Sequence, residues 1–431
     1  MKLFDDGLLA PENSFASVTR LLVSVIAPVM PSQQIYKPKS SGDSGQQVET
    51  RILRSLPELG EIRSFWERWP GNRDSDIDFY STVLSANSQS IRPHVIVIYR
   101  GGQPDAILVG RIDARRIDNF RMGYLRIKPK AVILYFVYGA LRGNPSFENS
   151  ELFVEEICKS LSRGEADLAY LNFFEPDSHI YKLAIKKPGP LRRDHVGISQ
   201  THFALTLPTS MEAFYKGLSP KVRKNQKWQA KKLAGDFPNA VKIKCFKDTA
   251  EVDSLADIAD QITGKSYQRG LGVGFINNAQ ARERLRLKAT KGWLRAYVLY
   301  LANCPCAFWM GDINQGIFGS DYLAFDPAFG KYSPGMYLIL QVIEGFCNGS
   351  DETVTGIDFA TGRAQYKEIL STREWQEISV YIFAPSFKGL ALNAVRTVAG
   401  GIDSGLKRLL LQTGLLQKIK KAWRARLRPV Q

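Results

Sequence analysis

The stretch that most constrains the fold is residues 323–340, LAFDPAFGKYSPGMYLIL. An apolar run typical of a buried strand ends in a turn at Pro327, and a loop with Gly330, Ser333 and Gly335 then leads into an amphipathic helical pattern. A loop of small residues that enters a helix exposes backbone N–H groups at the positive end of the helix dipole. Such groups bind phosphate well, so the stretch predicts a strand–loop–helix unit with an anion site.

Two halves of the chain follow one order of expected elements. In the first half the turn signal RGGQPD at residues 100–105 joins two strands, and a buried strand, a helix and a further strand follow it. The second half repeats strands and helices in that order, with longer helices. Because mixed sheets flanked by helices arise twice, we predict the α/β fold class, with α+β mixed sheets in two tandem domains.

A length of 431 residues exceeds one ordinary core and favours two domains. We expect a flexible arm at residues 1–50, whose second part is rich in Ser, Gln, Gly and Pro. The two domains then occupy residues 51–200 and 201–386. Residues 387–431 hold ten Lys and Arg against one acid, and we expect them to form a basic, amphipathic helical tail outside the catalytic fold.

The formal net charge of +16 favours anionic partners, although surplus Lys and Arg also serve simply to keep a surface soluble. Residues 221–232, KVRKNQKWQAKK, hold six basic residues and no acid. Lys221, Lys224 and Trp228 fall on one face of the helix expected there. That face is either solvated or binds an acidic substrate. A third interpretation, in which Trp228 stacks on a base of RNA, is less favoured than these two.

Three segments resemble the GNAT superfamily, and within it the divergent FemAB-like and CelD-like acyltransferases. Residues 331–335 (KYSPG) resemble the recurrent ySPG loop of that branch. Residues 358–362 (DFATG) with residues 366–367 (YK) resemble its DFgxG…YK segment, and the basic helix at residues 219–233 is the third likeness. The resemblance covers roughly residues 201–383, and the first half resembles the superfamily in element order only.

The general phosphate-loop pattern of the superfamily is Gln/Arg-x-x-Gly-x-Gly/Ala. On this chain only Gly335 matches it strictly, because Gly330 replaces the polar residue and Ser333 replaces the first glycine. The resemblance still implies GNAT-like domains in which a CoA thioester lies between two splayed parallel strands. It implies five residues that bind the co-substrate, namely Lys331, Tyr332, Ser333, Gly335 and Met336.

The resemblance also implies a direct attack of an amine on the thioester. Tyr366 occupies the position from which a superfamily tyrosine protonates the departing thiolate, and a phenol stays protonated at neutral pH. Tyr366 is either this acid or an aromatic residue that packs its helix on the sheet. Asp358 is either the general base or a strand-end residue with local hydrogen bonds. Lys367, with Lys221, Lys224 and Trp228, completes the expected substrate-binding set.

We therefore expect an acyl-CoA-dependent acyltransferase, with acetyl-CoA as the donor. The acceptor implied is an amine or hydroxyl of an acidic or sugar-like small molecule, or of an envelope or polysaccharide precursor. Three alternatives stay open: a Fem-type peptidyltransferase that uses aminoacyl-tRNA, an N-acyltransferase that uses an acyl carrier protein, and a non-catalytic GNAT scaffold. No metal is expected, since Cys304 and Cys306 lack a second Cys or His pair.

The expected location is the cytoplasm. The first residues carry no secretory signal, and the apolar run at residues 21–30 is shorter than the ~20 residues that span a bilayer. Five scattered cysteines favour a reducing compartment. Residues 407–428 predict an amphipathic helix that either folds back on the protein or lies on an anionic membrane, peripheral to the inner membrane face.

Overall fold

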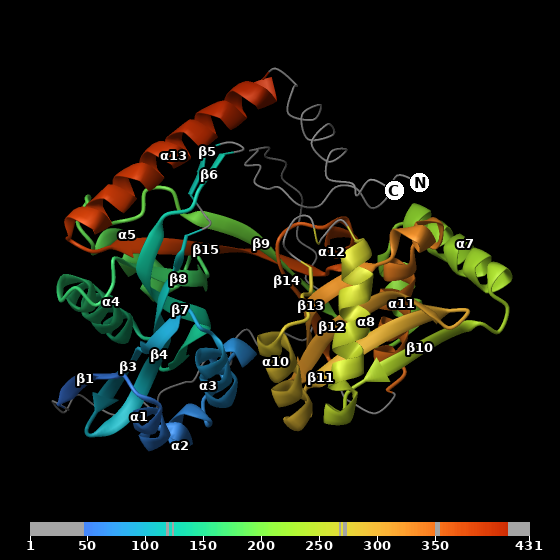
Figure 1. The fold of residues 1–431 in the computed structure, drawn as a ribbon, viewed down its shortest axis with the longest axis horizontal. Helices are drawn as coiled ribbons and strands as arrows, with labels where there is room; N and C mark the ends of the chain where they lie inside the picture. The colour runs from blue at the N-terminus through green and yellow to red at the C-terminus, as the bar shows by residue number, and fades with distance from the viewer. Residues whose placement is uncertain are drawn as a thin grey trace, which may run out of the picture. The chain divides into compact units, whose positions relative to one another are not determined.

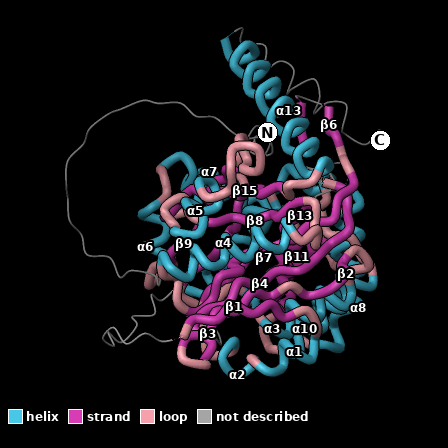
Figure 2. Tube along the Cα trace, turned by 90° about the vertical axis from the view of Figure 1, so that its left-hand side faces the viewer, coloured by secondary structure: helices cyan, strands magenta, loops and turns pink. Residues whose placement is uncertain are grey.

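The computed structural model describes residues 47–117, 120–122, 125–266, 269, 274–349 and 354–412. Helices and strands form two compact units (Figure 1). We call Gln200–Trp375 the C-terminal unit, and the described parts of Pro11–Ser199 and Gln376–Ile419 the N-terminal unit. Strands of both units pair in parallel as well as antiparallel, and Figure 2 shows helices around the strands, which confirms the predicted α/β fold class.

The N-terminal unit carries the first group of strands. Their order in the sheet is β1 (Val48–Leu53), β3 (Val95–Arg100), β4 (Gln103–Arg116), β7 (Lys130–Gly143), β8 (Leu168–Phe174) and β15 (Arg373–Phe383), which belongs to this unit from Gln376 onward. Strand β2 (Ser90–Pro93) pairs with β4, and β5 (Phe120–Met122) pairs with β6 (Leu125–Ile127). The helices are α1 (Leu56–Glu61), α2 (Arg63–Trp66), η1 (Arg73–Ser75), α3 (Ile77–Ala86), α4 (Phe147–Ser162), α5 (His179–Lys186) and α13 (Phe387–Gln412).

The C-terminal unit carries the second group. Its strands follow the order β9 (Ile198–Thr206), β14 (Gly356–Thr361), β13 (Ile317–Phe325), β12 (Cys304–Asn314), β11 (Leu294–Leu301) and β10 (Val241–Phe246). Its helices are α6 (Met211–Gly217), α7 (Pro220–Asp236), η2 (Thr249–Glu251), α8 (Val252–Lys265), α10 (Ala279–Thr290), η3 (Pro327–Tyr332), α11 (Pro334–Cys347) and α12 (Gln365–Leu370).

Strand β12 explains why helices cover both faces of the C-terminal sheet. Its consecutive side chains point to opposite faces, as the pleat of a strand requires. Ala307 and Trp309 join the core beneath α11, whereas Phe308 and Met310 join the core beneath α8 and α10. All four are fully buried, so this strand needs an apolar layer on each side.

Two boundaries differ from the expected domain division. The strand expected at residues 377–383 in the C-terminal domain forms β15 and pairs antiparallel with β8 of the N-terminal unit, for example Ile382 with Ala169. A strand's partner depends on tertiary pairing that its own residues do not specify. The division into independent domains stays a prediction.

Helix α13 differs from the appendage expected for residues 387–431. It starts at Phe387, and its Arg396 forms two hydrogen bonds of 2.9 Å with the carboxylate of Asp194. Both side chains are almost fully buried, and Leu392 and Ala399 pack beside them. The start of α13 is thus part of the N-terminal unit. Most of the amphipathic helix predicted at 407–428 lies outside the described residues, as does the apolar run at 21–30.

Membrane-spanning helices were not expected. In the ranges that the structure describes, no helix combines the length and the apolar character that crossing a bilayer requires.

Candidate functional site

The site begins where two parallel strands of the C-terminal unit separate. Strands β13 and β14 pair at three positions, from Ile317 with Gly356 to Gly319 with Asp358. Beyond them β13 continues to Phe325 and stays paired with β12, whereas β14 pairs with β9 on its other side. Among the described residues the parallel register of β13 with β14 therefore ends at Gly319 and Asp358, and the two strands diverge beyond it.

The predicted strand–loop–helix unit follows β13. Ser333 adopts the left-handed conformation, with φ 51° and ψ 52°, and Pro334 begins the 14-residue helix α11. The N–H groups of Gly335 and Met336 lie in the first turn, where a helix offers them no acceptor. The side chain of Ser333 makes no capping hydrogen bond. The start of α11 therefore has two backbone donors without an acceptor in the helix, both at buried residues, together with the positive end of a helix dipole.

Gly335 lies inside this first turn. A Cβ atom built there would lie 3.5 Å from the Phe325 ring, an ordinary contact, and its φ is not in the left-handed region. The fold itself therefore tolerates a side chain at Gly335. A glycine at this point instead lets a ligand approach the backbone closely.

The N-terminal unit has a related element order with a different helix start. Strands β7 and β8 pair in parallel, and α4 lies between them in sequence. Here Ser146 accepts a hydrogen bond of 3.2 Å from the Asn149 N–H, and the Asn149 side chain donates to Asp105 over 2.7 Å. The start of α4 is thus capped by the Ser146 side chain. The nearby Asp105 carboxylate is negatively charged and disfavours the binding of an anionic ligand there.

A histidine and an aspartate lie at the end of β14. His202 of β9 shares a hydrogen bond of 2.5 Å with Oδ1 of Asp358, and the N–H of Ala360 donates to the same oxygen over 2.7 Å. The His202 ring stacks on Trp375 at 4.3 Å and is 2% exposed, whereas the Asp358 side chain is 31% exposed. His202 is thus the buried partner that orients a reachable carboxylate.

Lys367 fixes the turn that follows β14. Ala360 and Gly362 have φ of 60° and 92°, and the Lys367 amine donates to the carbonyls of Ala360 (3.3 Å) and Thr361 (2.9 Å). Burial lowers the pKa of Lys367 to about 8, while the charge of Asp358 acts in the opposite direction. The amine is occupied by the protein's own backbone, so its expected contact with substrate stays a prediction.

Tyr366 precedes Lys367 on α12. Its ring meets the ring of Phe359 edge-on, with centroids 5.9 Å apart and an angle of 85° between planes. The side chain is half-buried, so it both packs on the sheet and reaches the surface. Its role as an acid stays a prediction.

The remaining expected residues lie on or beside α7. Lys221, Lys224 and Trp228 are exposed on this helix. The hydroxyl of Tyr332 donates to Asp236 at the end of α7 over 2.8 Å, which joins the helix to the loop before α11. Lys331 is exposed, whereas Tyr332 and Met336 are buried beneath the loop. The buried pair therefore supports the loop through packing.

His202 is the residue that the sequence interpretation missed. The four histidines show no metal-like spacing, and His202 lies 156 residues from Asp358 along the chain. The two meet because β9 pairs with β14, with His202 in register with Thr361. No local pattern in the sequence indicates this pairing.

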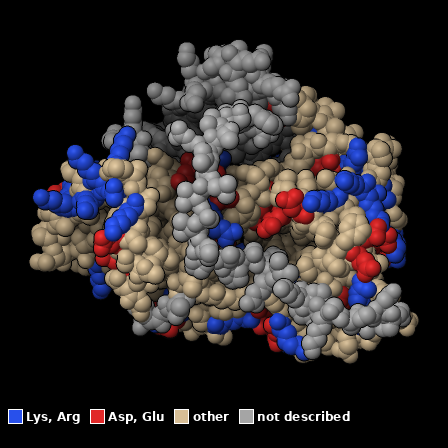
Figure 3. Space-filling view, turned by 180° about the vertical axis from the view of Figure 1, so that it is seen from behind, with Lys and Arg blue, Asp and Glu red and all other residues tan. Residues whose placement is uncertain are grey.

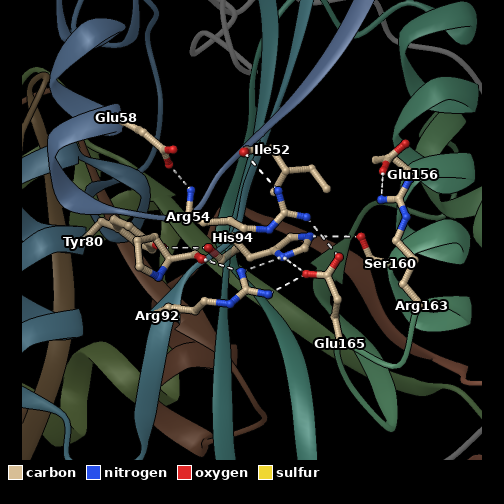
Figure 4. A network of polar contacts seen from close by, with 12 residues as sticks. Ile52, Arg54, Glu58, Tyr80, Arg92, His94, Glu156, Ser160, Arg163 and Glu165 are labelled. Atoms are coloured by element: carbon tan, nitrogen blue, oxygen red, sulfur yellow. Dashed lines mark hydrogen bonds and ion pairs between the residues drawn. The ribbon is translucent and has the colours of Figure 1, made fainter.

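A second cluster of titratable groups occupies the N-terminal unit (Figure 4). The ring of His94 lies between Ser160, at 3.3 Å, and Glu165, at 3.5 Å, and Glu165 also binds Arg54 and Arg92. His94 and Ser160 are fully buried, and burial lowers the pKa of His94 to about 3. A neutral histidine and a serine without access to solvent hold the unit together and cannot meet a substrate.

Comparison with protein families gives one match. Residues 220–368 match the family described as acetyltransferase (GNAT) domain. The matched range contains α7, the loop before α11, β14 and Tyr366. No curated protein matches the sequence.

Several solved structures are similar at low identity. FemX is 10% identical, over 77% of this chain and 96% of its own, with a TM-score of 0.48. A tandem GNAT protein from the clavulanic acid biosynthesis pathway is 11% identical, over 79% and 99%, with a TM-score of 0.47. The C-terminal domain of a putative lysylphosphatidylglycerol synthetase from Agrobacterium fabrum is 11% identical, over 80% and 97%, with a TM-score of 0.46. None of the three bears on the substrate of this chain.

Proposed function

Since residues 220–368 match the acetyltransferase (GNAT) domain family, we propose that the protein transfers an acyl group, acetyl in the simplest case, from acyl-CoA to an amine or hydroxyl. One observation carries the choice of donor. The start of α11, where Ser333 makes no side-chain cap, follows β13 after the short helix η3, and β13 is the strand that diverges from β14. The N–H groups of Gly335 and Met336 suit a pyrophosphate.

The reaction forms one bond and breaks one. The acceptor nitrogen, or oxygen, attacks the thioester carbonyl, the new C–N or C–O bond forms, and the C–S bond breaks. The attacking group loses its proton to Asp358, and Tyr366 gives a proton to the departing sulfur. Holding both reactants at one place supplies much of the rate, because the attack becomes effectively unimolecular.

Asp358 is our choice of base for a geometric reason. Two hydrogen bonds fix its Oδ1 atom, while the carboxylate remains partly exposed. His202 acts on this carboxylate as a positioning residue. Lys367 shapes the turn beside it, and an acidic or sugar-like acceptor would enter from the exposed side.

The cellular setting belongs to the same proposal. We propose a cytoplasmic enzyme that modifies an envelope or polysaccharide precursor, with the basic C-terminal residues near an anionic membrane face. The net charge of +16 supports this setting. It supports equally an aminoacyl-tRNA or an acyl carrier protein as donor, so the donor is the first thing to test.

The test is direct. The protein would be purified from its own cells and examined by native mass spectrometry for bound thioesters, and the CoA affinity of the purified protein would be measured by calorimetry. We expect a bound acyl-CoA and a Kd of ~1–100 μM, the range of ordinary enzyme substrates. Binding of an acyl carrier protein or of aminoacyl-tRNA, with no measurable CoA binding, would overturn the proposal.

A further inference from the structure

Helix α7 carries a dense positive charge beside the proposed donor site. Six of its residues are Lys or Arg, and Asp236 is its one acid. Figure 3 shows Lys and Arg side chains gathered over this helix, at the upper left of the view. The Asp236 carboxylate accepts the hydroxyl of Tyr332, and its charge also acts on Lys331, so it offsets only part of the positive charge of this face. The face therefore keeps its attraction for anions.

Two lysines from different elements meet at one ring of this face. The amine of Lys232, on α7, lies 5.7 Å from the centroid of Tyr332, and the amine of Lys331, on η3, lies 4.8 Å from it. The pKa of Lys331 is raised by the adjacent Tyr332 hydroxyl. The ring that both amines approach belongs to Tyr332, the residue immediately before Ser333, the N-cap of α11.

An exposed aromatic ring completes the group. Trp228 is 55% exposed, which is uncommon for so large an apolar side chain. The amine of Lys232 lies 5.1 Å from its ring centroid. An open indole beside an ammonium group can stack on a base while the cation binds an adjacent phosphate.

We propose that Trp228, Lys232 and Lys331 bind the 3′-phosphoadenosine end of CoA, with the base on Trp228 and the 3′-phosphate between the two amines. The inference rests on the proposed function, because it assumes that pyrophosphate occupies the start of α11. CoA carries a base and a phosphate dianion next to its pyrophosphate, the order in which the structure presents indole, amines and helix start. The phosphopantetheine of a carrier protein has no such nucleotide.

The test compares CoA with 3′-dephospho-CoA, which lacks only the 3′-phosphate. Calorimetry would give Kd values for the wild type, the double variant Lys232→Gln/Lys331→Gln, and Trp228→Ala. Lys182→Gln, at an exposed lysine of the N-terminal unit, is the control for loss of a surface charge far from α7 in the sequence. All substituted side chains are at least partly exposed, and thermal unfolding of each variant would verify its fold.

We expect the wild type to bind CoA ~10-fold more tightly than dephospho-CoA, because charge-assisted hydrogen bonds discriminate by about this factor. In the double variant the ratio should fall to within ~2-fold, while Lys182→Gln keeps it. Trp228→Ala should weaken both ligands by ~5-fold or more and leave their ratio unchanged, since stacking does not depend on the phosphate.

Three results would overturn the inference. If the wild type binds CoA and dephospho-CoA equally well, the proposed 3′-phosphate site is wrong, while the proposed acyl-CoA-dependent function is unaffected. An unchanged ratio in the double variant would place the phosphate elsewhere. Loss of tRNA binding in Trp228→Ala, with CoA binding intact, would make α7 a polynucleotide surface. Absence of any CoA binding by the wild type would overturn the proposed function itself.

Discussion

Nε2 of His202 and Oδ1 of Asp358 lie 2.5 Å apart in a hydrogen bond that joins a buried imidazole to a carboxylate side chain that is 31% exposed. The imidazole also stacks on the ring of Trp375, which lies parallel to it. The carboxylate therefore has one preferred orientation, with the N–H of Ala360 as its second donor. If Asp358 is the base, as we propose, this fixed orientation lets it take a proton without reorganisation.

The first prediction concerns this pair. His202→Ala should lower kcat by ~10- to 100-fold while KM for acyl-CoA changes less than ~2-fold, since it disturbs the base and not donor binding. In His202→Gln the amide nitrogen can donate to the same oxygen, and most of the rate should return. Steady-state kinetics of both variants measure this. If the glutamine variant is as slow as the alanine variant, His202 serves packing against Trp375 alone.

The second prediction concerns Tyr366. Tyr366→Phe keeps the ring that packs on Phe359 and removes the hydroxyl, so the variant should fold normally. Turnover should fall by ~10²–10⁴-fold if the hydroxyl is the general acid. The measurement is single-turnover acyl transfer beside a thermal unfolding curve. Turnover at the wild-type rate would make Tyr366 a packing residue.

The third prediction concerns the pH dependence of stability. The pKa of Lys367 is lowered from 10.5 to about 8 in the folded protein. Between these pH values the unfolded chain binds more protons at Lys367, so wild-type stability should rise relative to Lys367→Met by up to ~1.4 kcal/mol per pH unit. Below pH 8 both states are protonated, and the difference should be constant.

Urea unfolding of both proteins at pH 7, 8, 9 and 10 measures this difference. Taking the difference between the two proteins cancels the titration of all other groups. A flat difference across the four pH values would show that the Lys367 amine is not desolvated as the structure has it.

The fourth prediction concerns helix α13. Arg396→Ala removes one partner of the buried pair with Asp194 and should lower the free energy of unfolding by ~3–5 kcal/mol, because it leaves a buried charge uncompensated. Lys388→Ala breaks the more exposed pair of the same helix with Asp167 and should cost less than ~1 kcal/mol. Equal, small effects of the two substitutions would mean that α13 is an appendage after all.

The strand–loop–helix unit could be predicted because its signals are local. Pro334 and the apolar spacing after it define the start of α11, and Gly335 lies in its first turn as expected. The partner of Asp358 could not be predicted, because His202 reaches it only through the pairing of β9 with β14. The same reason explains why the unit of β15 was not predicted. Its residues predict a strand but do not specify the partner, and its pairing with β8 depends on tertiary packing.

The proposal depends most on phosphate binding at the start of α11. Gly335→Val places a branched side chain at the proposed contact between CoA and the backbone, and its Cβ atom would lie at an ordinary contact distance of 3.5 Å from Phe325. Gly330→Val is the matched control, since Gly330 lies in the same loop, is exposed and has open space around it.

The most direct test is therefore the Kd of CoA for these two variants and the wild type, measured by calorimetry on proteins with equal thermal stability. The proposal predicts that Gly335→Val weakens CoA binding by ~10-fold or more, because several charge-assisted hydrogen bonds are lost, while Gly330→Val stays within ~2-fold of the wild type. A folded Gly335→Val protein with wild-type affinity for CoA would contradict it.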